Sequence, residues 1–513
     1  MNILFAFADD WGRYASAYAG RPGASPWNQL IKTPNFDRVA AEGALLTNAF
    51  IQAPTCTPCR SSILSGRFFW QTGLGAILRG AVWDDSIPTY PLELEKAGWH
   101  IGHTYKVWSP GKTANAPYGG SRTAYNPAGQ RYANFSHEAT KRVPEVGVAQ
   151  AKAELLEETR QNFDAFLAAR PEGAPFCYWW GPTNTHRTWE PGSGHALWGL
   201  NPDDLEGRMP EFLPDVPVVR EDVADYLGEC QAVDAGLGVI LDRLEAEGEL
   251  DDTLIVVSGD HGIPGIPRAK CNLYDIGCEV ALAVRWPGRV QPGRVVDDFV
   301  SLMDLAPTFL EAAGLSAHPD MAGRSLLPVL ESPDSGQIDE QRDHVITGRE
   351  RHVDTARAGE LPYPQRAIRT QDYLYILNFE PDRWPMGDPQ GLDDLSQIPP
   401  SFSDLQWVTR PAYADFDASP TKAWMIHHRS ERSVRPLFEL AFGKRPYAEL
   451  YDLRVDPHYM QNEAGSPQYA DTQQELHQKL MAALTEASDP RVVERPCRFE
   501  EPPYAGPLAP FQI

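Results

Sequence analysis

Two apolar runs that each end in acidic residues constrain the fold of this chain more than any other feature. Asn2–Ala8 is followed directly by Asp9-Asp10, and Asp252–Ser258 is followed shortly by Asp260-His261. Short continuous apolar runs of this kind are typical of buried strands. In an open α/β sheet, ligands bind beyond the carboxyl ends of the strands, so the two acidic clusters can meet there.

Strand and helix patterns alternate along the first two thirds of the chain. The apolar runs His100–Val107, Pro175–Trp180 and Val280–Trp286 predict further strands. Such alternation favours a doubly wound, mostly parallel sheet with helices on both faces. The helices that we expect between the strands begin at Thr33-Pro34 or span Arg60–Gly66, Leu92–Ala97, Val148–Ala168, Val223–Glu247 and Asp304–Ala313.

The composition turns polar around Glu331–Gln341, and we predict a domain boundary there. The first domain would span 1–335 and carry the chemistry, and a smaller α+β domain would span 336–513. In the second domain, Arg366–Asn378 alternates apolar and polar residues and predicts an edge strand of an antiparallel sheet. Thr472–Ala487 predicts a closing helix.

Composition excludes several classes of protein. The chain has 513 residues, of which 42% are hydrophobic and 23% charged, so it is not wholly disordered. No apolar stretch approaches the ~18 residues of a membrane helix. The net charge of −24 opposes binding to nucleic acid and to anionic membranes, so we expect neither as a partner. An anionic substrate would require a local cluster of Lys and Arg.

The seven cysteines are an odd number spread over a long chain, which does not indicate a disulfide framework. Cys271 and Cys278 could still close a small loop in an oxidising compartment. The chain opens on Met1 without a basic leader segment or a cleavage site. It is therefore cytoplasmic as written, or periplasmic or secreted if a leader was removed, and the sequence leaves both open.

The two acidic clusters together predict a divalent-cation site. Asp9, Asp10 and Asp260 offer hard carboxylate oxygens, and His261 adds one nitrogen. Any single Asp at such a position more often caps a helix or a turn. The match between two clusters at equivalent strand ends favours the metal over the caps.

The segment Cys56-Thr57-Pro58-Cys59-Arg60 contains a lone C-x-x-C pattern. A zinc site would need a second such pair or paired histidines at finger spacing, and the chain has neither. A redox pair would need a thioredoxin-like βαβ unit around it. The third interpretation is that the two cysteines are small hydrophobic residues of the core.

With its continuation to Gly66, this segment resembles the signature C-x-P-S-R-x-x-L-L-T-G of the sulfatase family at the defining Cys, Pro, Arg and Gly positions. The resemblance implies that a formylglycine-generating enzyme oxidises Cys56 to formylglycine, whose hydrated aldehyde is the nucleophile. Cys59 stands where the family usually has Ser, but the core C-x-P-x-R is intact. The resemblance also implies an alkaline-phosphatase-like fold, with a large sheet sandwiched by helices.

The resemblance extends over nearly the whole chain and assigns further residues. It implies that Asp9, Asp10, Asp260 and His261, with position 56, hold the metal, and that Arg60, Lys106, His186 and Lys270 belong to the active site. Asn272-Leu273-Tyr274 and the placing of His186-Arg187 look most like heparan N-sulfatase (sulfamidase) members. Those members read Lys-x-His where this chain reads Lys106-Val107-Trp108, so the usual His is absent and Trp108 would reshape the pocket.

The residue types suit cleavage of a sulfate. The guanidinium of Arg60 can donate two hydrogen bonds to oxygens and hold the nucleophile. Lys106 and Lys270 would clamp the sulfate, and His186 would be the general acid for the leaving group. As residues that contact the sugar we predict Trp108, His195, Arg349 and His352.

The sequence therefore predicts a sulfatase with formylglycine at position 56 and one divalent cation, Ca²⁺ with Mn²⁺ or Mg²⁺ as alternatives. The substrate would be a sulfated sugar or a small sulfate ester, as O-sulfate or N-sulfate. A phosphonate monoester or phosphodiester hydrolase of the same superfamily is the nearest alternative. A non-catalytic binder of sulfated glycans is the alternative if Cys56 stays unconverted. Relatives of this kind are commonly homodimers.

Overall fold

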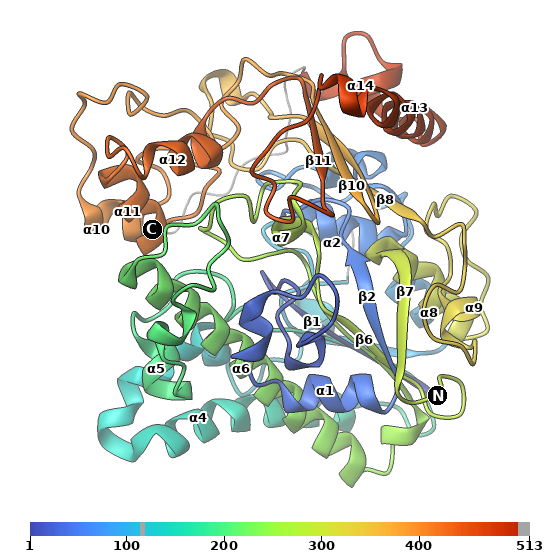
Figure 1. Cartoon of the computed structure of the whole chain (residues 1–513). Helices are drawn as coiled ribbons and strands as arrows, with labels where there is room; N and C mark the ends of the chain where they lie inside the picture. Colours follow the sequence, from blue (N-terminus) through green and yellow to red (C-terminus); the bar gives the residue numbers. More distant parts are fainter. Residues whose placement is uncertain (113–117, 501–513) are drawn as a thin grey trace.

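The computed structural model describes residues 1–112 and 118–500, which contain two separate sheets (Figure 1). The larger sheet has seven strands in the order β3-β4-β1-β5-β6-β2-β7. Only β6 runs antiparallel to its neighbours, so the predicted mostly parallel sheet is confirmed. In that order the strands are β3 (His100–Tyr105), β4 (Phe176–Gly181), β1 (Asn2–Ala8), β5 (Thr253–Gly259), β6 (Leu282–Arg285), β2 (Ala44–Phe50) and β7 (Arg294–Ser301).

Helices cover both faces of this sheet because β1 is apolar on both sides. Ile3, Phe5 and Phe7 belong to one hydrophobic core, and Leu4, Ala6 and Ala8 belong to another. Successive side chains of a strand point to opposite faces, so the two cores lie on opposite sides of the sheet. The first core contains α2 (Cys56–Ser65), α3 (Tyr90–Lys96), α8 (Leu305–Ala312) and α9 (Leu327–Leu330); the second contains α1 (Pro34–Ala41), α4 (Phe135–Ala169), α5 (Ser193–Trp198) and α6 (Pro217–Ala246).

The smaller sheet is antiparallel, in the order β11-β10-β9-β8. Its strands are β8 (His344–Arg349), β9 (Gln365–Thr370), β10 (Tyr373–Asn378) and β11 (Ala448–Asp452). Helix α13 (Ala470–Glu486) packs its leucines into the core of this sheet. Figure 1 shows this sheet and α13 at the end of the molecule away from α4 and α1.

The prediction of one edge strand over Arg366–Asn378 is wrong. The segment forms two inner strands, β9 and β10, which pair with each other around the turn at Gln371-Asp372. The alternation of apolar and polar residues continues on both sides of this turn, and the turn contains neither Gly nor Pro. For that reason the period of two alone does not reveal where the chain reverses.

A group of short helices lies between β10 and β11 in the chain and was not predicted. It comprises α10 (Phe402–Trp407), α11 (Pro420–His427) and α12 (Arg435–Phe442), which share a small core of their own. Helix α11 also packs against α6, one of the helices that cover the larger sheet. This contact holds the segment between α10 and α11 near the larger sheet, where Asp417 lies beside Lys270.

Several element boundaries differ from the sequence-based expectations. Helix α2 begins at Cys56 rather than at Arg60, and α4 begins at Phe135, with non-helical backbone at Gly147. Strands β2 and β7 were not predicted; β7 carries Asp297 and Asp298, which interrupt its apolar pattern. All seven cysteines are free, so Cys271 and Cys278 form no disulfide. Within residues 1–112 and 118–500, no helix combines the length and apolarity that a bilayer span requires.

Candidate active site

The two acidic clusters lie next to each other at one edge of the larger sheet. Strands β1 and β5 are parallel neighbours with Ala8 opposite Gly259, so the residues that follow them emerge together. The backbone N–H of Asp10 donates to Oδ1 of Asp260 over 2.7 Å. Asp9, Asp10, Asp260 and His261 are all buried.

Cys56 is the first residue of α2, which points its N-terminus at this cluster. The Sγ atom of Cys56 lies 3.4 Å from Nε2 of His261. Burial, and then the charge of Asp9, raise the pKa of the Cys56 thiol well above its usual range. The unmodified side chain is therefore a neutral thiol and not the thiolate that a bare cysteine nucleophile requires.

Arg60 lies one turn further along α2 and joins that helix to both acidic strand ends. Its Nε donates to Asp260 over 2.8 Å, and its Nη2 donates to Asp9 over 3.1 Å. Nη1 donates to the carbonyl of Val107, which follows β3. The guanidinium is completely buried, so three strand ends and α2 meet at one side chain.

Two lysines approach the cluster from other loops. Lys106 Nζ donates to both carboxylate oxygens of Asp9 over 2.7 Å, and Lys270 Nζ donates to Asp10 over 3.0 Å. Burial lowers the pKa of each lysine, but the neighbouring acids outweigh it and raise the pKa overall. Burial likewise raises the pKa of Asp9, and Lys106 and Arg60 outweigh it and hold that pKa well below its usual range. Both lysines therefore stay charged.

The residues that we predicted as metal ligands fit a divalent cation. Ligand atoms of Asp10, Cys56 and His261, and likewise of Asp9, Cys56 and Asp260, lie within 4.8 Å of one another. His261 Nδ1 faces the carbonyl of Gly262, which can only accept, so Nε2 presents its lone pair 3.2 Å from Oδ1 of Asp10. Oδ1 of Asp10 has no hydrogen-bond partner among the described residues. A cation between these two acceptors would satisfy both.

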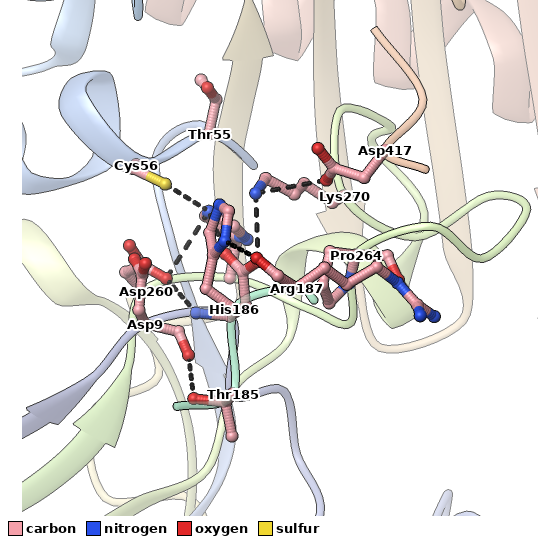
Figure 2. A network of polar contacts seen from close by, with 12 residues as sticks. Asp9, Thr55, Cys56, Thr185, His186, Arg187, Asp260, Pro264, Lys270 and Asp417 are labelled. Carbon is pink, nitrogen blue, oxygen red and sulfur yellow. Dashed lines mark hydrogen bonds and ion pairs between the residues drawn. The ribbon is translucent and has the colours of Figure 1, made fainter. Parts of the chain in front are cut away.

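His186 enters the site from the loop after β4. Thr185 donates its hydroxyl to the carbonyl of Asp9, and His186 Nδ1 lies 2.7 Å from the carbonyl of Arg187. Arg187 itself forms a bidentate pair with Asp222 of α6, at 2.7 and 2.9 Å. Figure 2 shows His186 between the Asp9–Asp260 side of the site and the Lys270–Asp417 side.

A cavity of about 1010 Å³ opens in front of these residues. Six of the predicted residues line it, namely Asp9, Cys56, Lys106, His186, Lys270 and His352. His352 is buried and lies with Nδ1 2.6 Å from the hydroxyl of Thr55, the residue before Cys56. Burial lowers the pKa of His352 to about 3, although Asp415 opposes this, so the ring is neutral.

The structure does not bring Arg349, Trp108 or His195 to this cavity. Arg349 is completely buried and bonds to Asp415 and to the carbonyls of Cys271 and Pro385. Trp108 turns its ring into the core, where it packs on Trp83 and donates to Ser61 over 2.8 Å. His195 is exposed on α5. None of the three side chains is among the cavity-lining residues of the described chain.

Sequence reasoning missed other residues in the cavity wall, above all Asp417. It lies between α10 and α11, and its carboxylate is 3.3 Å from Lys270 Nζ. Figure 2 shows the two side chains pointing toward each other. The cations Arg79, Lys112, Arg187 and Arg410 also line the cavity. Arg187 belongs to the His186-Arg187 pair of the resemblance, whereas Arg79, Lys112, Arg410 and Asp417 belong to no motif. The nearest sequence signal to Asp417 is Ser419-Pro420, which is typical of a helix start.

Comparison with known proteins identifies the family of this chain. A family model described as Sulfatase matches residues 1–315, and one described as N-sulphoglucosamine sulphohydrolase, C-terminal, matches residues 268–397. The human protein named N-sulphoglucosamine sulphohydrolase is 28% identical over 528 residues, covering 96% of this chain and 91% of that protein.

Two solved structures have the same fold. One is described as a complex with its substrate D-glucosamine-2-N,6-O-disulfate; it is 20% identical, has a TM-score of 0.58 and covers 96% of this chain and 99% of that chain. The other is the phosphonate monoester hydrolase of Agrobacterium radiobacter, at 18% identity and a TM-score of 0.61, covering 95% of this chain and 96% of that chain. At such identities the likeness concerns the fold.

Proposed function

Because this chain belongs to the sulfatase family, whose model spans residues 1–315, we propose that it hydrolyses the sulfate ester or sulfamate of a sugar with a formylglycine derived from Cys56. The observation that carries the proposal is the position of Cys56. It is the first residue of α2, its Sγ lies 3.4 Å from Nε2 of His261, and the charges of Asp9, Lys106 and Lys270 all act on it.

The residues around position 56 suit the binding of a sulfate group. The free N–H groups at the start of α2, a helix of 10 residues, favour an anion there. Lys106 and Lys270 are charged and line the cavity, so they can clamp sulfate oxygens. Arg60 is turned away from the cavity and completely buried, so its role is to hold Asp9 and Asp260 in place.

A modified side chain at position 56 and a bound metal ion would complete the chemistry. A hydrated formylglycine at position 56 would supply a hydroxyl nucleophile. A divalent cation, Ca²⁺ in our proposal, would supply a positive charge that stabilises anionic oxygens beside position 56. Asp9, Asp10, Asp260 and His261 would hold that cation beside position 56.

His186 is our candidate for the residue that protonates the leaving group. It lines the cavity, and its Nδ1 is engaged by the Arg187 carbonyl, so Nε2 is the nitrogen available to a substrate. A positioned general acid contributes typically ~10²–10⁴-fold to the rate. The core position of Trp108 leaves this role to His186 rather than to a residue at 108.

A sulfated sugar suits the cavity by charge and by size. The lining contains six Lys and Arg side chains although the whole chain has a net charge of −24. Local cations of this kind attract an anion that the surrounding surface would repel. The volume of about 1010 Å³ lies at the upper end of the ~300–1,000 Å³ usual for small-molecule sites and has room for a sugar.

A phosphonate or phosphodiester substrate would use the same cation-lined cavity. The fold likeness to a phosphonate monoester hydrolase therefore makes this the second candidate function. Assays on a phosphonate monoester beside a sulfate ester decide between them through the ratio of kcat/KM.

The test combines mass spectrometry with activity. Trypsin cleaves after Arg38 and Arg60, and the peptide 39–60 contains position 56. Conversion replaces sulfur by oxygen and removes two hydrogens, so this peptide loses mass in protein made with a formylglycine-generating enzyme. We expect only the converted protein to cleave an aryl sulfate, and Cys56→Ala to be inactive under both conditions. A thiol that persists beside the converting enzyme, or equal activity of Cys56→Ala, would refute the proposal.

A further inference from the structure

The cavity wall contains one acidic residue that the binding of sulfate does not explain. Among the described lining residues, only Asp9 and Asp417 are acidic, against Arg79, Lys106, Lys112, Arg187, Lys270 and Arg410. Asp9 belongs to the cluster behind Cys56. Asp417 comes from the segment between α10 and α11, outside the sheet that builds the rest of the sulfate clamp.

Asp417 is charged and faces the reacting centre. Burial raises its pKa, but Lys270 and then His186 outweigh this and hold the pKa below its usual range. The side chain keeps 18% of its surface exposed, and its Oδ2 lies 3.3 Å from Lys270 Nζ. His352 also interacts electrostatically with it, so Asp417 lies among the groups that surround position 56.

The segment that carries Asp417 is anchored on both sides. Ser419 donates its hydroxyl to the carbonyl of Gly265 over 2.7 Å, which ties the segment to the loop of Lys270. Thr421 donates to Asp222, the same carboxylate that holds Arg187 beside His186. The position of Asp417 relative to Lys270 and His186 is thus built into the fold.

A carboxylate repels a sulfate, so its place in this wall suits a hydrogen-bond donor or a positive charge on the substrate. We propose that Asp417 is a specificity-determining residue, whose carboxylate accepts hydrogen bonds from the sugar next to the scissile bond and favours nitrogen over oxygen as the leaving atom. This inference rests on the proposed sulfatase function and deepens it.

The chemistry of the two leaving groups explains the preference. Hydrolysis of an N-sulfate breaks the S–N bond and gives sulfate and an amine, which takes up protons and becomes an ammonium ion. Hydrolysis of an O-sulfate breaks the S–O bond and gives a neutral hydroxyl. Positive charge therefore develops near Asp417 only with the nitrogen leaving group, and a hydrogen bond to a charged group is stronger than one between neutral groups.

The first experiment compares Asp417→Asn with wild type on three substrates. These are glucosamine N-sulfate, N-acetylglucosamine 6-O-sulfate and 4-nitrophenyl sulfate, which lacks sugar donors. We expect kcat/KM to fall by roughly 10–100-fold on the N-sulfate, less on the O-sulfate and least on the aryl sulfate. An equal loss on all three would overturn the proposal, because it would mean that Asp417 acts only by orienting Lys270.

The control is Asp404→Asn, which removes the same charge from an exposed residue of the neighbouring helix α10. We expect it to leave all three kcat/KM values unchanged. If the wild-type protein cleaves none of the substrates, the proposed function fails, and that outcome is separate from a uniform effect of Asp417→Asn.

A second measurement needs no turnover, and its first arm uses only the wild-type protein. Calorimetric titration of the wild-type protein should show tighter binding of glucosamine than of glucose at pH 7, since only the former carries an ammonium group. In Asp417→Asn the difference should disappear. Equal affinity of the wild type for both sugars would overturn the proposal.

Discussion

Arg60 shows how one side chain assembles the site. It is completely buried, and it bridges Asp9 after β1 and Asp260 after β5 from α2. Its removal would leave the buried Asp260 without this cation and Asp9 with Lys106 alone, and breaking a comparable buried pair costs about 3–5 kcal/mol. We therefore expect Arg60→Ala to lower the unfolding free energy by about that amount, measured by denaturant titration, and to abolish activity.

Arg67→Ala provides the matched comparison. Arg67 pairs with Asp320, whose side chain is 62% exposed, so this pair should contribute below about 1 kcal/mol. If both variants lose the same stability, the buried bridge is not what holds the acidic strand ends together.

At the scale of elements, helix α6 contains three buried acids whose pKa values are raised. Asp225 and Glu229 have pKa values raised to about 7, and Asp234 has one raised to about 6, in each case mainly by burial. Each accepts backbone N–H bonds from another segment: Asp225 from Gly194, Glu229 from Ser136 and Asp234 from Phe36. These bonds fix α6 against α5, α4 and α1.

These raised pKa values predict how stability depends on pH. The unfolded chain loses these protons near pH 4, whereas the folded chain keeps them until about pH 6–7. Because the folded state binds more protons in this window, stability is greatest below it and declines as the pH rises through 7. We expect the melting temperature to fall between pH 5.5 and 8, and Glu229→Gln to show a smaller fall. A melting temperature that rises over this range in both proteins would contradict the explanation.

The segment between α10 and α11 depends on Lys422. This lysine is completely buried, and its Nζ donates to the carbonyls of Thr409, Tyr413 and Phe416 at 2.9, 3.3 and 2.8 Å. Burial lowers its pKa to about 7, and Asp417 and Asp415 oppose this only in part. Above pH 7 the amine becomes neutral, and its bonds to the three carbonyls weaken.

We therefore expect KM for a sulfated sugar to rise above pH 7 in the wild type. Lys422→Met should have a KM that is roughly tenfold higher at pH 6 and does not change further with pH. Lys422→Arg keeps its charge at all these pH values and should retain the low KM at pH 9. Identical pH profiles of KM in wild type and Lys422→Met would rule out this role, and Lys479→Met at the surface is the control.

At the scale of the whole molecule, the proposed metal site joins three segments that are far apart in the chain. Its ligands follow β1, begin α2 and follow β5. A cation that binds only the folded chain stabilises it by about 2.7 kcal/mol at a concentration of 100 times Kd. We expect Ca²⁺ to raise the melting temperature and a chelator to reverse this.

Asp10→Asn should remove most of that Ca²⁺-dependent shift, because Oδ1 of Asp10 faces the lone pair of His261. Asp320→Asn, at an exposed acid, should retain it. A melting temperature that ignores both Ca²⁺ and chelator would contradict the metal assignment by a measurement independent of activity.

The larger organisation brings both sheets to one cavity. Strand ends of the larger sheet supply Asp9, Lys106 and His186, while His352 and Asp417 come from segments after β8 and after α10. We propose that the division into 1–335 and 336–513 separates a part that binds the sulfate from a part that recognises the sugar. The expected homodimer stays a prediction.

The sequence by itself determined the family, the α/β class and the residues closest to position 56. The predicted relationship to the sulfatases is confirmed, since the signature residues Cys56, Pro58 and Arg60 are local in the chain. The apolar runs that end in acidic residues predict correctly that Asp9 and Asp260 lie at strand ends. The reason is that strands buried on both faces of a parallel sheet appear in the sequence as continuous apolar runs. These features depend on short-range chemistry that a linear sequence displays.

Only the tertiary structure decided which distant residues reach the cavity. Arg349 and Trp108 have the chemistry of sugar-binding residues, but packing places both in the interior, where Asp415 and Ser61 bind them. Asp417 belongs to no sequence motif. It reaches Lys270 because α11 packs on α6. The physical reason is that side-chain direction and long-range packing depend on contacts between segments that are far apart in the sequence, and local patterns do not contain these contacts.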